Sequence, residues 1–135
     1  MNDPLYQQAG YDFMKAAFEV YNEMGNGYTE DIYQECLEDE LTERKIAFRP
    51  QAELTISYKN KPLRRTLHPD LMVSEDIIVE LRAAKILTAE HYAQVLNYLK
   101  ATGKSVAYLV NFGNPQKLEW KRFVRSTTLA KASAN

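Results

Sequence analysis

One acidic residue lies inside an otherwise aliphatic segment of this sequence. Glu80 is the fourth residue of the run Ile77–Leu81, whose other members are all apolar. A carboxylate in such surroundings costs free energy unless a base, a proton or a metal ion compensates it. Side chains alternate between the two faces of a strand, so we expect Glu80 and Arg82 to point the same way.

A second acid is expected beside Glu80. Asp70 follows Pro69, and the turn residues Ser74–Asp76 should fold its segment back along the run that contains Glu80. Two carboxylates on adjacent strands offer the oxygen ligands that suit Mg²⁺ or Mn²⁺. The alternative is a buried ion pair between Glu80 and Arg82, with Asp70 only starting a turn.

Polar side chains also follow one side of a predicted helix over residues 88–102. At 100° per residue, His91, Gln94 and Tyr98 fall within about 60° of one another. They lie at the margin of the apolar arc, which indicates a cleft lined by this helix. The alternative is a tyrosine with its ring in the core and its hydroxyl in water, beside a surface glutamine.

The periodicity of apolar residues predicts the elements that position these side chains. Helical spacing covers residues 11–24, ended by Gly25–Gly27, and a second helix runs from near Thr29 to near Lys45. Period-two or continuous apolar patterns predict strands at residues 54–58, 63–73 (bent near Pro69), 77–81, 106–112 and 118–124, the last at an edge. The order is ααβββαββ, which is typical of an α/β or α+β fold with a mixed sheet flanked by helices.

Length and composition favour one globular domain over residues 1–135. The 135 residues are 45% hydrophobic and 26% charged, and we expect an ordered core from about 8 to 126 with a short flexible C-terminal tail. No apolar run approaches the ~20 residues of a membrane span, and the N-terminus does not resemble a secretory signal. A single cysteine, Cys36, cannot form an internal disulfide, which favours a cytoplasmic location.

The net charge of −1 hides an uneven distribution. Residues 1–43 sum to −10, whereas residues 44–135 sum to +9. Bases cluster at Lys59, Lys61, Arg64 and Arg65, and again at Lys117, Lys121, Arg122 and Arg125. The basic part could face a polyanion such as nucleic acid, or the two halves could simply attract each other. The predicted edge strand also leaves a homodimer open.

Several short motifs together resemble a known family. The pattern Gly27-x-x-Glu30-x-x-Tyr33 resembles the signature of the GxxExxY proteins, small bacterial and archaeal domains of the PD-(D/E)xK nuclease superfamily. The resemblance extends over about residues 13–125 and includes Leu54–Tyr58, Pro69–Leu71, Ile78–Leu81, His91 with Gln94, Leu96–Lys100 and Asn111–Gly113. It implies the restriction-endonuclease-like core αβββαβ, with one extra N-terminal helix and an extra C-terminal strand.

The resemblance also implies a metal-dependent nuclease that hydrolyses phosphodiester bonds in DNA or RNA. Asp70 and Glu80 correspond to metal-binding acids, the backbone carbonyl of Leu81 to a further ligand of Mg²⁺ or Mn²⁺, and Glu30 to an acid contributed by the helix before the sheet. Metal-assisted hydrolysis suits this set, because bare carboxylates would repel a phosphodiester.

The remaining implied roles lie on the substrate side and at Arg82. Gln94 and Tyr98, with His91 on the same helix, would line the substrate side of the site. The family pattern has lysine where this chain has Arg82, and arginine cannot act as a base because it stays protonated. The alternative function is therefore a catalytically silent relative that binds nucleic acid or a protein partner.

Overall fold

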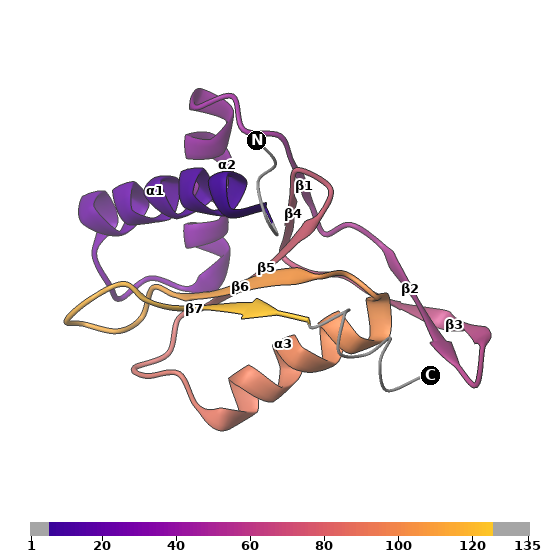
Figure 1. The fold of residues 1–135 in the computed structure, drawn as a ribbon. Helices are drawn as coiled ribbons and strands as arrows, with labels where there is room; N and C mark the ends of the chain where they lie inside the picture. Colours follow the sequence, from indigo (N-terminus) through magenta and orange to yellow (C-terminus); the bar gives the residue numbers. More distant parts are fainter. Residues whose placement is uncertain (1–5, 126–135) are drawn as a thin grey trace.

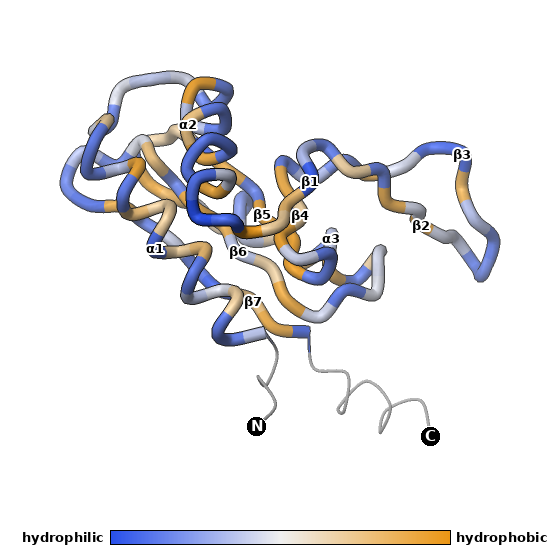
Figure 2. The backbone as a smooth tube through the Cα atoms, turned by 90° about the horizontal axis from the view of Figure 1, so that it is seen from above, coloured by the Kyte–Doolittle hydropathy of each residue, from blue (hydrophilic) through white to orange (hydrophobic). Residues whose placement is uncertain are grey.

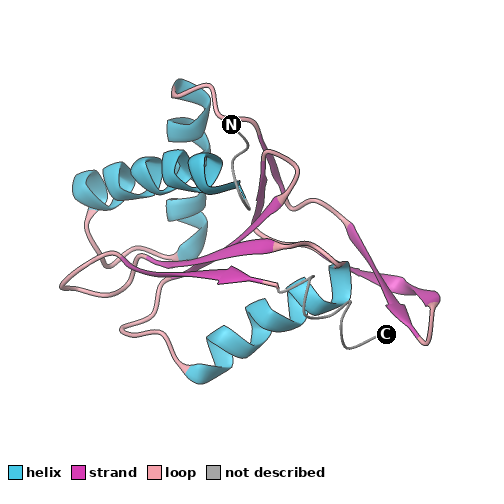
Figure 3. Cartoon of the chain, in the orientation of Figure 1, coloured by secondary structure: helices cyan, strands magenta, loops and turns pink. Residues whose placement is uncertain are grey.

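The computed structural model describes residues 6–125, and Figure 1 shows how their helices and strands are arranged. The central sheet has five strands in the spatial order β1-β4-β5-β6-β7, whereas β2 and β3 pair only with each other. Helices α1 and α2 cover one face of the large sheet, and α3 lies against the other face (Figure 3). The bounds are α1 Gln7–Met24, α2 Glu30–Glu43, β1 Phe48–Pro50, β2 Leu54–Tyr58, β3 Lys61–Leu67, β4 Leu71–Val73, β5 Ile77–Arg82, α3 Ala89–Thr102, β6 Val106–Asn111 and β7 Glu119–Val124.

The middle of the sheet is one parallel pair. β5 runs parallel to β6, with Glu80 opposite Leu109 and Arg82 opposite Asn111, and α3 is the crossover between the two strands. The other neighbouring pairs are antiparallel. Burial on both faces explains why both strands are almost entirely apolar. Their C-terminal ends lie side by side, so Arg82 and Asn111 mark one end of the sheet.

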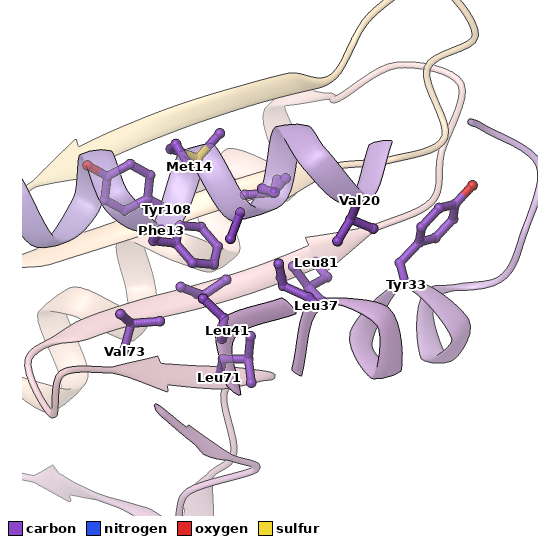
Figure 4. Packing of buried hydrophobic residues seen from close by; sticks show 14 of the residues in the cluster. Phe13, Met14, Val20, Tyr33, Leu37, Leu41, Leu71, Val73, Leu81 and Tyr108 are labelled. Atoms are coloured by element: carbon purple, nitrogen blue, oxygen red, sulfur yellow. The ribbon is translucent and has the colours of Figure 1, made fainter. Parts of the chain in front are cut away.

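Separate clusters of buried side chains lie on the two faces of the sheet. Under α1 and α2, side chains from both helices meet those of β4, β5 and β6, and Figure 4 shows this packing. Under α3, Val95 and Leu99 pack against Ile78 and Leu109. The second cluster is smaller, and Leu96 on α3 is 50% exposed.

The helices confirm the sequence pattern closely. α1 buries Phe13, Ala17 and Val20. The helix ends at its C-cap residue Gly25, which has a positive φ of 70° that glycine adopts without strain. α2 begins after the N-cap residue Thr29. On α2 the structure buries Tyr33, whereas Ile32 is 39% exposed.

Two strand predictions need correction. The strand expected over 63–73 is two strands in different sheets, because the chain leaves the β2–β3 hairpin at Leu67 and enters the large sheet only at Leu71. The first strand of the large sheet is β1, which was not predicted. The core order αβββαβ is therefore α2-β1-β4-β5-α3-β6, and the predicted strand 54–58 belongs to a hairpin inserted between β1 and β4.

The extra elements lie where the pattern placed them. α1 precedes the core, and β7 is an edge strand of the large sheet, next to β6. The expected C-terminal tail lies outside the described residues. Across residues 6–125, no helix is long and apolar enough to cross a membrane.

Candidate functional site

The hairpin of β4 and β5 brings Asp70 and Glu80 together. Leu71 pairs with Val79, so the antiparallel register places Asp70 opposite Glu80 just beyond the last paired residue of β4. The backbone N–H of Asp70 donates to Glu80 Oε2 at 2.9 Å, and the backbone N–H of Leu81 donates to Asp70 Oδ2 at 2.8 Å. Each acid therefore accepts a hydrogen bond from the other strand, and the two carboxylates are held side by side.

Burial makes the ionised form of Glu80 expensive. Glu80 is only 6% exposed. Desolvation, followed by the charge of Asp70, raises the pKa of the Glu80 carboxyl to about 7, against the opposing effects of the Asp70 N–H and of Arg82. Near neutral pH the Glu80 carboxyl therefore exchanges its proton readily, and an added cation would favour its ionised form.

Arg82 lies between the acids and α3. Its Nη1 donates to the carbonyl oxygen of Leu81 at 2.7 Å and lies 3.5 Å from Glu80 Oε1. Its Nη2 donates to Gln94 Oε1 at 2.6 Å. The expectation that Glu80 and Arg82 share a face is confirmed. The guanidinium bonds the same carbonyl that the resemblance assigned to a metal ion.

Helix α3 brings Gln94 and Tyr98 to this place. Gln94 is exposed and accepts the hydrogen bond from Arg82 with its amide oxygen. The two N–H donors of the same amide are not used in that bond. Tyr98 is half-buried, and burial together with the charges of Glu80 and Asp70 raises the pKa of its phenol. His91 has a different contact, since its Nδ1 accepts the backbone N–H of Thr88 at 3.0 Å and so caps the helix.

The structure does not bring Glu30 into the acid pair. The side chain is exposed and lines a hollow of about 530 Å³ at the N-terminus of α2, together with Tyr28, Thr29, Asp31 and Ala83. Ala83 directly follows Arg82, so this hollow borders the site. Over residues 6–125, no three His, Cys, Asp or Glu side chains are placed to hold one metal ion together.

The donor set at Asp70 and Glu80 is nevertheless suited to a hard cation. Two carboxylates and the Leu81 carbonyl supply oxygen ligands only, which matches Mg²⁺ or Mn²⁺. The burial of Glu80 beside the charge of Asp70 is an independent indication, because a divalent cation would relieve both the desolvation and the repulsion. Arg82 would have to release the Leu81 carbonyl for that oxygen to take part.

Residues to which the sequence pattern assigned no role in the site also position it. Gln34 Nε2 on α2 donates to the Asp70 carbonyl at 2.8 Å and so fixes the backbone at the start of β4. Asn111 is fully buried, and its side-chain amide bonds both the N–H and the carbonyl of Ala84, at 2.9 and 2.8 Å. Glu119 accepts hydrogen bonds from Asn111 and from the Leu87 N–H. Apart from the Asn111–Glu119 contact, these contacts join residues 27 to 36 positions apart, so local periodicity carries no trace of them.

Comparison with solved structures gives matches of low sequence identity. A chain described as the crystal structure of SSO0001 matches with a TM-score of 0.55 and 17% identity, covering 77% of this chain and 55% of that one. An alkaline exonuclease from Laribacter hongkongensis, LHK-Exo, matches with a TM-score of 0.39 and 12% identity, covering 70% of this chain and 55% of that one. This chain thus spans about half the length of either protein. No curated protein matches.

A family comparison covers almost the whole described chain. Residues 7–123 match the PD-(D/E)XK nuclease superfamily, from the start of α1 to within one residue of the end of β7. The matched segment includes the Asp70–Glu80 pair, Arg82 and α3, and the mixed sheet flanked by helices agrees with the fold of that superfamily. The chain belongs to the PD-(D/E)XK nuclease superfamily.

Proposed function

We propose that the protein hydrolyses phosphodiester bonds in DNA or RNA with a divalent cation, Mg²⁺ or Mn²⁺, held by Asp70 and Glu80. The observation that carries this proposal is the pair of carboxylates fixed by crossed hydrogen bonds, one of them 6% exposed. Within the superfamily we place the chain among the GxxExxY proteins, on the strength of Gly27, Glu30 and Tyr33.

Each side chain has a distinct part in this proposal. Asp70 and Glu80 would hold the cation, which when bound would polarise the phosphate and lower the pKa of the attacking water. Arg82 remains charged and places a guanidinium beside the phosphate, where it offsets negative charge without accepting a proton. Gln94 and Tyr98 contact the substrate from α3, since both lie beside Arg82 or the acid pair.

A second candidate function is a domain that binds nucleic acid without cleaving it. The position of Arg82 favours it, because one guanidinium contacts the Leu81 carbonyl, Gln94 and Glu80 together. Such an ion pair compensates Glu80 from within the protein and competes with a cation for the same oxygens.

Metal binding tests the acid pair directly. Mn²⁺ binding, followed by electron paramagnetic resonance, is expected at one site in the wild type and weaker by at least tenfold in Asp70→Asn and Glu80→Gln. Asp39→Asn and Glu23→Gln, which change exposed acids on α2 and α1, should bind like the wild type. Unchanged affinity for both Mn²⁺ and nucleic acid in the two site variants would reject both candidate functions at this site.

Arg82→Lys separates the two candidates. Lysine is compact and can lose its proton, so the variant should cleave plasmid or labelled oligonucleotide at least as fast as the wild type with Mg²⁺ or Mn²⁺. Cleavage should stop in Asp70→Asn. If the wild type and Arg82→Lys are both inert with every metal and substrate while salt-sensitive binding persists, the protein is the silent binder.

A further inference from the structure

The β2–β3 hairpin stands apart from the large sheet. It pairs with no strand of that sheet and leaves the body of the protein beside α3 (Figures 1 and 2). Its base is anchored, because Leu54 packs against the cluster under α3. From Lys61 to Arg65 every residue of β3 is exposed. The hairpin therefore adds little to the core and presents its outer part to the surroundings.

The charge of the hairpin has one sign. Residues 54–67 contain four cations, Lys59, Lys61, Arg64 and Arg65, and no acid. All four side chains are exposed. The ion pairs found within residues 6–125 use Arg44, Arg49 and Arg82, and none of the four hairpin cations. One of the four cations contacts an aromatic ring, since Lys59 Nζ lies 5.5 Å from the ring centre of Tyr58.

The backbone holds these cations in a defined arrangement. Lys59 and Asn60 both have positive φ, 50° and 67°, so the two-residue turn matches the right-handed twist of its strands. The pairing register of β2 and β3 shifts away from the turn. Thr55 pairs with Thr66 and Ser57 with Pro62, so Leu63–Arg65 lie opposite the single residue Ile56. Arg64 and Arg65 therefore lie in the bulged part of β3.

The hairpin is joined directly to the candidate active site. β3 ends at Leu67, and Asp70 follows only three residues later. Seven residues of strand span about 23 Å, which is comparable to about seven base pairs of B-form DNA. The four cations lie in the outer part of this length, from the turn to Arg65, and can reach phosphates on one side of the bond that Asp70 and Glu80 would address.

We propose that the β2–β3 hairpin is a docking arm that binds the phosphate backbone of double-stranded DNA at the major groove. The proposal rests on the proposed function, which makes nucleic acid the substrate. A two-stranded ribbon fits the major groove of B-form DNA, whereas the major groove of duplex RNA is too narrow for side chains to read. The surplus of four cations that form no ion pair within residues 6–125 supplies the contacts to phosphate.

The test is equilibrium binding of a fluorescein-labelled 20-base-pair DNA duplex, measured by anisotropy over a range of salt concentrations in EDTA. The hairpin variant carries Lys59→Gln, Lys61→Gln, Arg64→Gln and Arg65→Gln. Affinity falls as salt rises, and each lost phosphate contact makes the plot of log affinity against log salt less steep by about 0.9. We expect the slope to fall by about 3 to 4 and the affinity at 0.1 M salt to fall by about 100-fold.

Two further variants serve as controls. Lys15→Gln, Lys45→Gln, Lys117→Gln and Lys121→Gln remove the same net charge from exposed sites outside the hairpin, and their combination should lower the slope by less than 1. A charge-preserving variant with Lys59→Arg, Lys61→Arg, Arg64→Lys and Arg65→Lys should bind like the wild type. It shows that charge, rather than damage to the hairpin, explains the loss.

Three results would overturn the proposed role of the hairpin. Equal losses in the hairpin variant and the distributed control, or tighter binding of the wild type to duplex RNA or single strands, would overturn the proposal. So would preferential binding to vesicles of phosphatidylserine and phosphatidylcholine. The binding assay contains EDTA and therefore measures DNA binding without metal-dependent cleavage. A protein that fails to cleave DNA when Mg²⁺ or Mn²⁺ is added would reject the nuclease proposal, and the binding result would still stand.

Discussion

At Glu80, two effects act in the same direction. Burial and the neighbouring charge of Asp70 both disfavour the ionised carboxylate, and the Asp70 N–H and Arg82 only partly offset them. The side chain accepts a backbone hydrogen bond and contacts one guanidinium, so its polar atoms are not orphaned. In the metal-free protein, therefore, Glu80 titrates close to neutral pH.

This titration predicts an unusual dependence of stability on pH. Protonated Glu80 is favoured in the folded state, so its contribution is fully present below the unfolded pKa of about 4.5 and is lost as pH rises through about 7. The shift corresponds to about 3 kcal/mol. Urea unfolding in EDTA should show the free energy of unfolding of the wild type falling by about this amount, relative to Glu80→Gln, between pH 4.5 and 7.5.

Glu23→Gln is the control for this experiment, because it changes an exposed glutamate on α1. Its stability should follow that of the wild type at every pH. A constant difference between the wild type and Glu80→Gln across the range would show that Glu80 does not titrate near 7 in the folded protein. Saturating Mg²⁺ should reduce the fall in the wild type, since it favours the ionised pair.

Sequence reasoning found the acid pair but not its full surroundings. The adjacency of Asp70 and Glu80 followed from a short turn and from the period of two in a strand, both of which are local rules. The contact of Arg82 with Gln94 and that of Gln34 with Asp70 depend on how helices pack on the sheet. No spacing in the chain encodes those distances, so the structure was needed to find them.

At the scale of elements, one polar cluster fixes the loop that joins β5 to α3. Asn111, at the end of β6, bonds the backbone of Ala84 with both atoms of its amide, as a neighbouring strand would. Glu119 on β7 accepts from Asn111, Asn114 and the Leu87 N–H. Burial raises the pKa of Glu119, but these hydrogen bonds outweigh it and leave the pKa lowered. The loop therefore delivers α3, with Gln94 and Tyr98, to a fixed position.

Asn111→Ala should loosen this loop and destabilise the protein. The substitution removes several buried hydrogen bonds and leaves the Ala84 N–H and carbonyl without their partner, which predicts a loss of about 2–4 kcal/mol in the free energy of unfolding. Hydrogen exchange should accelerate at residues 83–88. Asn97→Ala on the exposed side of α3 should change stability by less than about 0.5 kcal/mol.

If Asn111→Ala retained both its stability and its exchange protection, the loop would be held by other contacts. If stability fell but hydrogen exchange at residues 83–88 did not accelerate, Asn111 would stabilise the packing of the sheet and would not hold the loop. Both measurements are made on the metal-free protein, so they do not depend on the proposed activity.

The elements themselves were predicted in proportion to their length and periodicity. α1, α2, α3, β5 and β6 carry long or strongly apolar patterns, and the structure confirms them. β1 has three residues, one of them Pro50, which is too short for a periodic signal. The break between β3 and β4 was missed because both flanks are extended, and only pairing partners reveal that they belong to different sheets.

For the whole molecule, the separation of charge along the sequence becomes a separation in space. The acidic first part of the chain forms α1 and α2, whereas the basic hairpin projects away from both helices (Figures 1 and 2). A polyanion is repelled from the helical side and attracted to the hairpin. Under the proposed function, this distribution of charge would orient nucleic acid before any short-range contact forms.

Neutralising exposed acids of α1 and α2 should therefore act at a distance. A variant with Glu23→Gln, Glu35→Gln, Asp39→Asn and Glu43→Gln keeps the hairpin and the candidate site unchanged. Its affinity for duplex DNA in EDTA should rise several-fold at about 0.01 M salt, where charges act over about 30 Å, and should equal that of the wild type at 0.3 M, where screening confines them to less than about 8 Å. Stopped-flow measurements should assign the gain to faster association. A gain that persists at high salt would mean that these acids contact the DNA directly, and an unchanged affinity at low salt would mean that the acidic helices play no part in orienting it.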